Sequence, residues 1–281
     1  MKKSIAILAI SAFAFNASAQ ELTSKKGFPI LPEAGDWSIS FDAVPFLDYA
    51  FDKTRFMSAT PATSAAGALN YNVGNTLVGK YMKDANTAYR GIVRVGFNRT
   101  SVDNYVSKDG STTGEEVVDN AATTTSNITL GAGMQWYRGK GRLRGYYGAE
   151  ALLGIASGPS TTITYGNAYS TTNPTPTSTT SFISGTSSPV GSRFTETKSG
   201  MGFNIGARGF IGAEYFFAPK MSIGAEFGWG LGLNSVSDGE SKSDTWNGTA
   251  VQSSSSKFGG ISGFNMDVDN AGGSINLAIY F

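Results

Sequence analysis

Residues 200–233 read GMGFNIGARGFIGAEYFFAPK followed by MSIGAEFGWGLGL, and this stretch decides the fold. A short turn at Ala218–Lys220 separates two runs in which residues of two kinds alternate. Successive side chains of a strand point to opposite faces, so each run has two faces. One face is apolar and ends in aromatic residues, whereas the other is mostly glycine with Arg208, Glu214 and Glu226 among the exceptions. The pattern predicts an antiparallel hairpin.

The glycine face separates two kinds of sheet. Glycine weakens a strand, and the water-exposed face of a soluble sandwich gives no reason to use it repeatedly. The interior of a narrow closed barrel has such a reason, because it has room for only a few large side chains. From Met221 to Leu233 the chain advances roughly 40 Å at about 3.3 Å per residue. Tilted by about 40°, this run spans roughly 30 Å, the thickness of a bilayer core. The hairpin therefore favours a membrane barrel over a soluble sandwich.

The first residues are typical of an export signal. Lys2 and Lys3 precede an apolar run at 5–15, and small residues end at Ala19. This run is shorter than the roughly 20 apolar residues of a transmembrane anchor. We expect a signal peptide at 1–19, cleaved near Ala19 with Gln20 as the new terminus, and no lipoprotein, since no Cys follows the cleavage site. Residues 20–35 form an irregular leader tucked against the base of a barrel that occupies 36–281.

Composition excludes several classes of function. The chain has no Cys, no His and a formal net charge of +1. Disulfide and thiol chemistry are therefore absent, and the near-neutral balance gives no argument for nucleic acid. Small outer-membrane enzymes use Ser–His or Asp–His pairs, and without His the general base of those mechanisms is missing. We expect no enzyme, no cofactor and no metal site.

Eight segments of the chain show strand alternation, and the connections between them alternate in length. Those after the second, fourth and sixth segments are a few residues, whereas the others run to tens, as in transmembrane barrels with short periplasmic turns and long extracellular loops. We predict an all-β, up-and-down antiparallel transmembrane barrel of eight strands, or of ten if the alternation at 161–165 adds two. Val78 and Met82 interrupt the alternation of the second segment. The expected strands are 37–44, 73–82, 88–100, 122–137, 142–155, 200–218, 221–233 and 267–281.

Aromatic residues gather at the ends of these segments. Amphipathic rings concentrate at the two interfaces of a membrane, so two belts are expected in a spanning barrel. Near the short turns or termini lie Trp37, Tyr81, Tyr89, Trp136, Tyr215 and Phe281, and near the opposite ends lie Phe97, Phe203 and Trp229.

The inward face of the expected barrel carries charges of both signs. Buried charges must be paired, so a plug of salt bridges is the structural interpretation and a charged pore constriction the functional one. Across the turn at 218–220, Arg208 is expected opposite Gly228, with Glu226 on its diagonal. The candidate residues are Asp42, Lys80, Arg90, Arg94, Arg144, Glu150, Arg208, Glu214 and Glu226.

Three stretches carry a family resemblance: KKGFPILPEAGDW at 25–37, GAEYFFAPK at 212–220, and the terminal Tyr280-Phe281. They resemble the small outer-membrane β-barrel proteins of the Bacteroidota, and the layout is similar to OmpA- and OmpX-type eight-stranded barrels. The resemblance implies architecture and location in the outer membrane of a Gram-negative bacterium. It also implies that Tyr280 and Phe281 form the signal read by the barrel-assembly machinery.

The leading hypothesis is an outer-membrane barrel with a structural or surface-binding role, including that of an accessory subunit of an envelope complex. Its wall would meet lipid and lipopolysaccharide, and its Ser/Thr-rich loops would meet a macromolecular ligand or an envelope protein, because loops on a rigid scaffold commonly carry binding. The alternatives are a narrow channel for small solutes and a soluble periplasmic β-protein.

Overall fold

The computed structural model describes residues 22–42, 76–268 and 274–281. The expected signal peptide with its cleavage site near Ala19, most of the first long connection and the start of the second expected strand lie outside these residues. No helix within the described ranges is long and apolar enough to cross a membrane.

The described residues form fourteen strands. Their bounds are β1 Trp37–Asp42, β2 Thr76–Asp84, β3 Thr87–Ser107, β4 Glu116–Arg138, β5 Leu143–Thr164, β6 Thr177–Ser181, β7 Thr186–Pro189, β8 Ser192–Lys198, β9 Met201–Ala218, β10 Met221–Val236, β11 Gly239–Trp246, β12 Val251–Phe258, β13 Ile261–Val268 and β14 Ser274–Tyr280.

Eight of these strands close into a ring. Each strand pairs antiparallel with the next in the order β1, β2, β3, β4, β5, β9, β10, β14, and β14 pairs back with β1. The ring closes at β1, where Ser38 lies opposite Lys80 of β2 on one side and Tyr280 of β14 on the other. The all-β fold and the eight-stranded up-and-down barrel are therefore confirmed. The remaining strands lie outside the ring, so the ten-stranded alternative is wrong.

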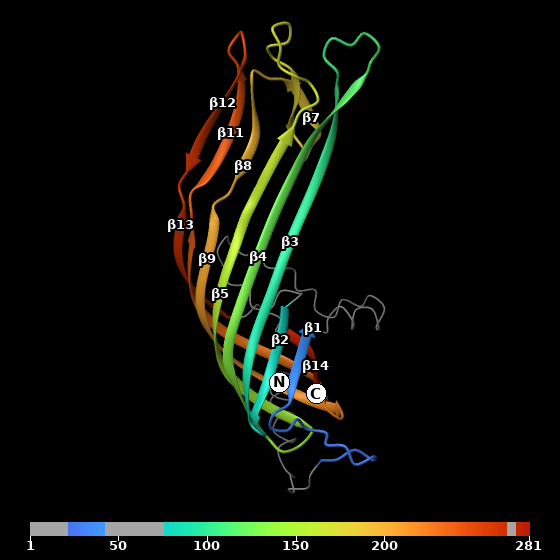
Figure 1. Ribbon diagram of the computed structural model, residues 1–281, viewed down its shortest axis with the longest axis vertical. Helices are drawn as coiled ribbons and strands as arrows, with labels where there is room; N and C mark the ends of the chain where they lie inside the picture. Colours follow the sequence, from blue (N-terminus) through green and yellow to red (C-terminus); the bar gives the residue numbers. More distant parts are fainter. Residues whose placement is uncertain (1–21, 43–75, 269–273) are drawn as a thin grey trace, which may run out of the picture.

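Several strands continue well past the ring at the long-loop end (Figure 1). β3 and β4 stay paired from Thr87 opposite Trp136 to Ser107 opposite Glu116. β8 continues the line of β9 along β5, and β11 pairs with both β8 and β12. The expected polar connection at 101–121 is thus mostly strand. Both faces of these extensions carry polar residues, so they lack the apolar alternation that marks a strand in sequence.

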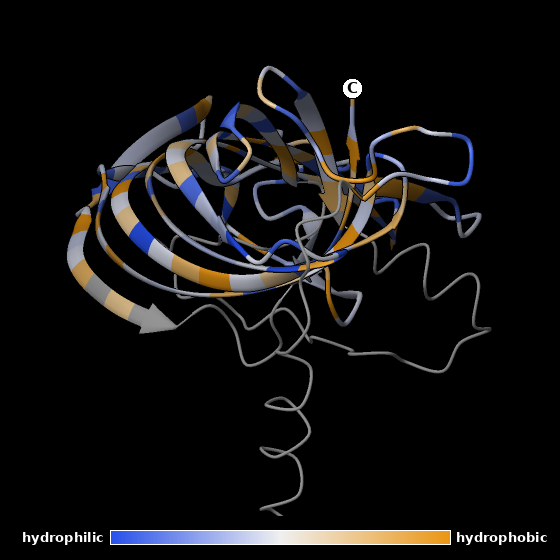
Figure 2. Ribbon diagram, turned by 90° about the horizontal axis from the view of Figure 1, so that it is seen from below, coloured by the Kyte–Doolittle hydropathy of each residue, from blue (hydrophilic) through white to orange (hydrophobic). Residues whose placement is uncertain are grey.

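The polarity of the barrel wall is the reverse of that in a soluble protein. Large apolar side chains are exposed on the outside, including Ile205 (49%) and Ile211 (62%), whereas Arg208 between them is 3% exposed. Figure 2 shows hydrophobic and hydrophilic residues alternating along the strands. The outward apolar face and the inward polar face predicted from the alternation are both present.

The two residues that interrupted the alternation of β2 point inward. Val78 is 8% exposed and packs with Ile92 and Leu152, while Met82 is fully buried. β2 therefore alternates like its neighbours. Its inner face carries the apolar Val78 and Met82 on either side of the charged Lys80.

The leader lies at the short-turn end of the ring. Ile30 is 1% exposed and packs in a cluster with Met82, Phe216 and Tyr280. The amide of Lys220 donates to the carbonyl of Ile30 at 3.0 Å, so leader and turn are joined by backbone as well as by packing.

Candidate functional site

A row of charged side chains crosses the interior of the barrel. In register, Lys80 lies opposite Arg90, Arg90 opposite Gly133, Gly133 opposite Glu150, and Glu150 opposite Arg208. The inward phase of five neighbouring strands, β2, β3, β4, β5 and β9, thus places these residues in one row. Gly133 supplies the space, because a Cβ at this position would meet the carbonyl oxygen of Ala149 at 2.3 Å. A side chain there would displace the row.

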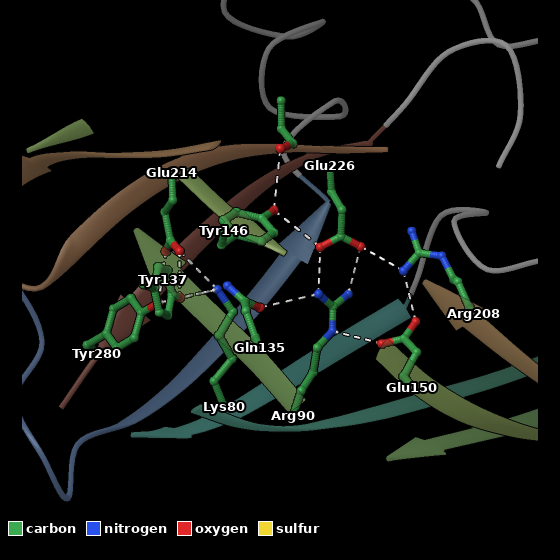
Figure 3. Close-up of polar contacts among 11 residues, drawn as sticks. Lys80, Arg90, Gln135, Tyr137, Tyr146, Glu150, Arg208, Glu214, Glu226 and Tyr280 are labelled. Carbon is green, nitrogen blue, oxygen red and sulfur yellow. Dashed lines mark hydrogen bonds and ion pairs between the residues drawn. The ribbon is translucent and has the colours of Figure 1, made fainter. Parts of the chain in front are cut away.

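Two arginines and two glutamates form a closed ring of ion pairs (Figure 3). Arg90 contacts Glu226 through both terminal nitrogens, at 2.5 and 3.0 Å, and its Nε lies 3.1 Å from Glu150. Arg208 bridges the same two carboxylates from the other side, with Nη1 at 2.8 Å from each. All four side chains are at most 4% exposed. Each charge has two opposite partners, which is what burial of charge requires.

A second centre forms around Glu214. Its carboxylate is 3.1 Å from Nζ of Lys80, accepts hydrogen bonds from the hydroxyls of Tyr137 at 2.8 Å and Tyr280 at 2.9 Å, and accepts a further one from Ser222. The ammonium of Lys80 also lies 5.7 Å from the ring centroids of both tyrosines. This carboxylate is therefore surrounded by donors.

Tyr146 links the two centres. Its hydroxyl donates to Glu226 at 3.2 Å, and its ring lies 5.7 Å from Nζ of Lys80. The cluster is consequently one network that runs across the barrel rather than two isolated pairs.

Of the remaining candidate residues, Arg144 contacts this network through the ring of Tyr137 rather than through an ion pair. Arg144 is buried, donates to the carbonyl of Ala85 and the side chain of Asn86 at 2.8 Å each, and covers the ring of Tyr137 at 4.5 Å. It closes the short-turn end. Arg94 is half-buried and lies farther along β3, toward the long loops. Asp42 ends β1 opposite Asn276, and its side chain lies outside the described part of the chain. The structure therefore joins six of the nine candidates.

The register across the β9–β10 turn differs from the expected one. Arg208 lies opposite Gly230 rather than Gly228, two residues farther along β10 than expected. Arg208 nevertheless reaches Glu226, as predicted, since both side chains are long.

Sequence reasoning missed the phenols. Tyr137 and Tyr146 fall in the inward set of their strands, and Tyr280 was considered only as part of an assembly signal. Tyr280 is 3% exposed with its hydroxyl in the network, whereas Phe281 is 64% exposed. An inward-phase tyrosine next to a predicted buried carboxylate is the signal that could have found them.

The network leaves little free space. A cavity of about 10 Å³, lined among others by Ser40, Lys80, Arg90 and Glu214, lies within it. A cavity of this size is about the smallest that can hold one water molecule. Among the described residues, no cluster of three or more Asp or Glu is arranged to hold a metal ion. The geometry suits a structural plug in which the buried charges of Lys80, Arg90, Glu150, Arg208, Glu214 and Glu226 are paired with one another.

The long-loop end contains a second organised region. Asp119 is fully buried, and its carboxylate accepts hydrogen bonds from the amide of Gly166 at 2.8 Å and from the amide and hydroxyl of Thr179 at 2.7 and 2.8 Å. These contacts fix the segment between β5 and β8 against the tall β3–β4 hairpin. The expected long loop at 157–197 is therefore folded over much of its length.

An arginine between two aromatic rings stabilises the same region. The guanidinium of Arg193 lies 4.5 Å from the ring of Tyr165 and 4.3 Å from that of Tyr169, and Tyr169 stacks on Trp246. Burial raises the pKa of Tyr165 to about 12, so its hydroxyl stays protonated and donates to the carbonyl of Phe194 at 2.8 Å. The β5–β8 segment and β11 are thereby joined.

No protein-family model and no curated protein matches the chain. The outer membrane protein OprG from Pseudomonas aeruginosa matches with 13% identity and a TM-score of 0.27, covering 90% of this chain and 98% of that one.

Proposed function

We propose that the protein is an integral outer-membrane barrel with a structural and surface-binding role. The observation that carries this proposal is the reversed polarity of a closed ring, with apolar side chains exposed outside and an ion-pair network inside. Monomeric soluble proteins rarely expose a continuous apolar surface, whereas a bilayer favours it. A closed barrel also satisfies every backbone group between strands within lipid.

The orientation follows from the connections. Short turns and the leader would face the periplasm, and the tall strands would face outward, as in bacterial outer-membrane barrels. Export through the 1–19 signal peptide, recognition of Tyr280 and Phe281 by the assembly machinery, and contact with lipopolysaccharide belong to the same proposal. The resemblance to small Bacteroidota barrels supports it.

The binding surface would be the region beyond the ring. Its strands, together with the segment fixed by Asp119 and Arg193, form a rigid support for the tips at 108–115, 182–185 and 247–250. A rigid scaffold with polar tips suits a macromolecular ligand or an envelope protein partner. We propose no catalytic role, because the sequence lacks His and the buried carboxylates already have partners.

Location is tested by membrane fractionation and gel mobility. The protein is expected in the outer-membrane fraction and, after purification in detergent, to migrate differently with and without heating. Recovery from the soluble periplasm without a heat-dependent shift would refute the barrel and favour a soluble β-protein.

Binding is tested by removing the β6–β7 hairpin. A variant in which residues 177–189 are replaced by a short Gly-Ser linker keeps all eight ring strands. It is expected to retain the heat-dependent shift but to lose co-purifying envelope proteins or surface ligands. If both the shift and the co-purified proteins persist in this variant and in one shortened at 247–250, the surface-binding role is wrong.

A narrow channel is the second candidate, favoured by the small cavity among the ion pairs. Reconstituted wild-type protein is expected to show no conductance, because the network fills the lumen. The Arg208→Ala/Glu226→Ala variant removes one positive and one negative side chain of the plug together. The remaining charges, Arg90 and Glu150, still pair with each other. Conductance of wild-type protein would favour the channel, and a closed double variant would exclude it.

A further inference from the structure

The first half of the leader forms a closed turn that presents two lysines and a phenylalanine. Thr23 and Pro29 form a β-bridge, and the amide of Ser24 donates to the carbonyl of Phe28 at 2.8 Å. Gly27 adopts a φ of +82°, which side-chain-bearing residues rarely adopt, so this turn depends on glycine. Lys25 and Lys26 at its tip are exposed. The shape of the tip is therefore set by its own hydrogen bonds.

The base of the leader is held firmly by the barrel. Ile30 is buried in the cluster at the short-turn end, the amide of Gly35 donates to the carbonyl of Met82 at 2.8 Å, and Nζ of Lys220 lies 2.8 Å from Asp36. Figure 1 shows the leader extending sideways from this end of the ring of strands. A firmly held base fixes the direction in which the tip points.

The tip carries an exposed apolar side chain, and the leader then runs into an aromatic pair on the barrel wall. The side chain of Phe28 is 60% exposed. Burial of an apolar side chain of this size is stabilising, and the turn does not bury it. The leader continues directly into Trp37, which is 57% exposed and lies 4.8 Å from the ring of Tyr81, and the amide of Trp37 donates to the carbonyl of Phe281 at 2.9 Å. Exposed aromatic rings of this kind mark the headgroup level of a membrane.

Charge at this end of the barrel is strongly positive. The leader and the short turns carry seven cations against four anions, a balance of +3, whereas the whole chain is at +1. Clusters of Lys and Arg next to a membrane attract anionic lipid headgroups. The cations are Lys25, Lys26, Lys83, Arg138, Lys140, Arg142 and Lys220, and the anions are Glu21, Glu33, Asp36 and Asp84.

We propose that the leader tip docks on the periplasmic leaflet of the same membrane, with Phe28 inserted at headgroup depth and Lys25 and Lys26 paired with anionic phospholipid phosphates. This inference rests on the proposed membrane location. An apolar ring flanked by lysines is the chemistry of interfacial anchors. Docking would fix the short-turn end of the barrel against displacement along the membrane normal.

Depth measurement by spin labelling tests the docking. The chain has no Cys, so single substitutions label one site each. A nitroxide at Phe28→Cys replaces one apolar side chain by another, and a nitroxide at Ile205→Cys reports on the barrel wall. Full-length protein is reconstituted in phosphatidylcholine vesicles with or without phosphatidylglycerol, and the accessibility of each label to oxygen and to a water-soluble nickel chelate is compared.

With phosphatidylglycerol, the Phe28→Cys label is expected to be shielded from the chelate and accessible to oxygen. Adding Lys25→Gln and Lys26→Gln is expected to shift the docking equilibrium roughly tenfold or more toward the free tip. Each of the two lysines contributes electrostatic attraction to the anionic membrane surface, and both contributions are lost. The matched control, Lys108→Gln with Lys257→Gln, removes the same charge from the long-loop end and is expected to change nothing at the tip.

Separate outcomes overturn the inference and the proposed function. A Phe28→Cys label open to the chelate in phosphatidylglycerol vesicles, with the Ile205→Cys label in lipid, refutes docking and leaves the barrel intact. Equal shielding with and without phosphatidylglycerol refutes the pairing with anionic lipid. An Ile205→Cys label open to the chelate refutes the membrane location and docking together.

Discussion

Removing the carboxylate of Glu226 is the sharpest perturbation of the buried network. Glu226 meets both terminal nitrogens of Arg90, Nη1 of Arg208 at 2.8 Å and the hydroxyl of Tyr146 at 3.2 Å. In Glu226→Ala, both arginines share Glu150 alone, so one buried positive charge lacks an opposite partner. Breaking a buried ion pair in this way costs about 3–5 kcal/mol of the free energy of unfolding.

Glu226→Gln separates charge from shape. The amide keeps the side-chain volume and one oxygen acceptor but loses the negative charge. We expect a smaller cost of about 2 kcal/mol, the range of a charged hydrogen bond. As a matched control, Glu115→Gln removes a carboxylate from the exposed ion pair with Lys108 at the long-loop end, where 55% of the Glu115 side chain is exposed. No measurable change is expected for the control.

Urea unfolding in vesicles, followed by the heat-dependent gel shift, measures these costs. With an m-value of about 2 kcal/mol/M, the Glu226→Ala midpoint is expected to fall by about 2 M. A fall of less than about 0.5 M, which corresponds to roughly 1 kcal/mol at that m-value, would show that the arginines are hydrated in solution and that the closed plug is wrong.

Three further predictions test other parts of the molecule. Gly133→Ala is expected to cost about 1–3 kcal/mol by urea unfolding, because its Cβ meets backbone atoms, whereas Gly91→Ala, with nothing within 4 Å, is expected to be tolerated; equal effects would contradict the packing. Asp119→Ala is expected to expose the 165–191 segment to protease while the barrel persists, since buried donors lose their acceptor, and an unchanged digestion pattern would contradict this. Hydrogen bonds from Lys198 and Lys242 hold the pKa of Glu196 below 4.5, so the ion pair between Glu196 of β8 and Lys242 of β11 is complete above that pH and is lost as the pH falls through the lowered value. NMR titration of the Glu196 carboxyl, assigned with Glu196→Gln, checks this, and a pKa of 4.5 or higher would contradict it.

The sequence by itself determined the ring of eight strands. Strand alternation has a period of two, so each residue between Met201 and Val236 is assigned to one face as soon as a single inward residue is known. Short and long connections then order the strands without any knowledge of their neighbours in space. The same logic placed Lys80, Arg90, Glu150, Arg208, Glu214 and Glu226 inside.

Apart from the pair Arg208–Glu226, only the tertiary structure decided which of these charges meet. Arg90 and Glu226 are 136 residues apart, and their contact depends on closure of the ring, which leaves no periodic signal. The same holds for Asp119 and Thr179, whose contact depends on a segment rich in Ser and Thr without apolar alternation. Where burial is one-sided, the sequence records it as alternation; where contacts are polar and distant along the chain, only the folded geometry brings them together.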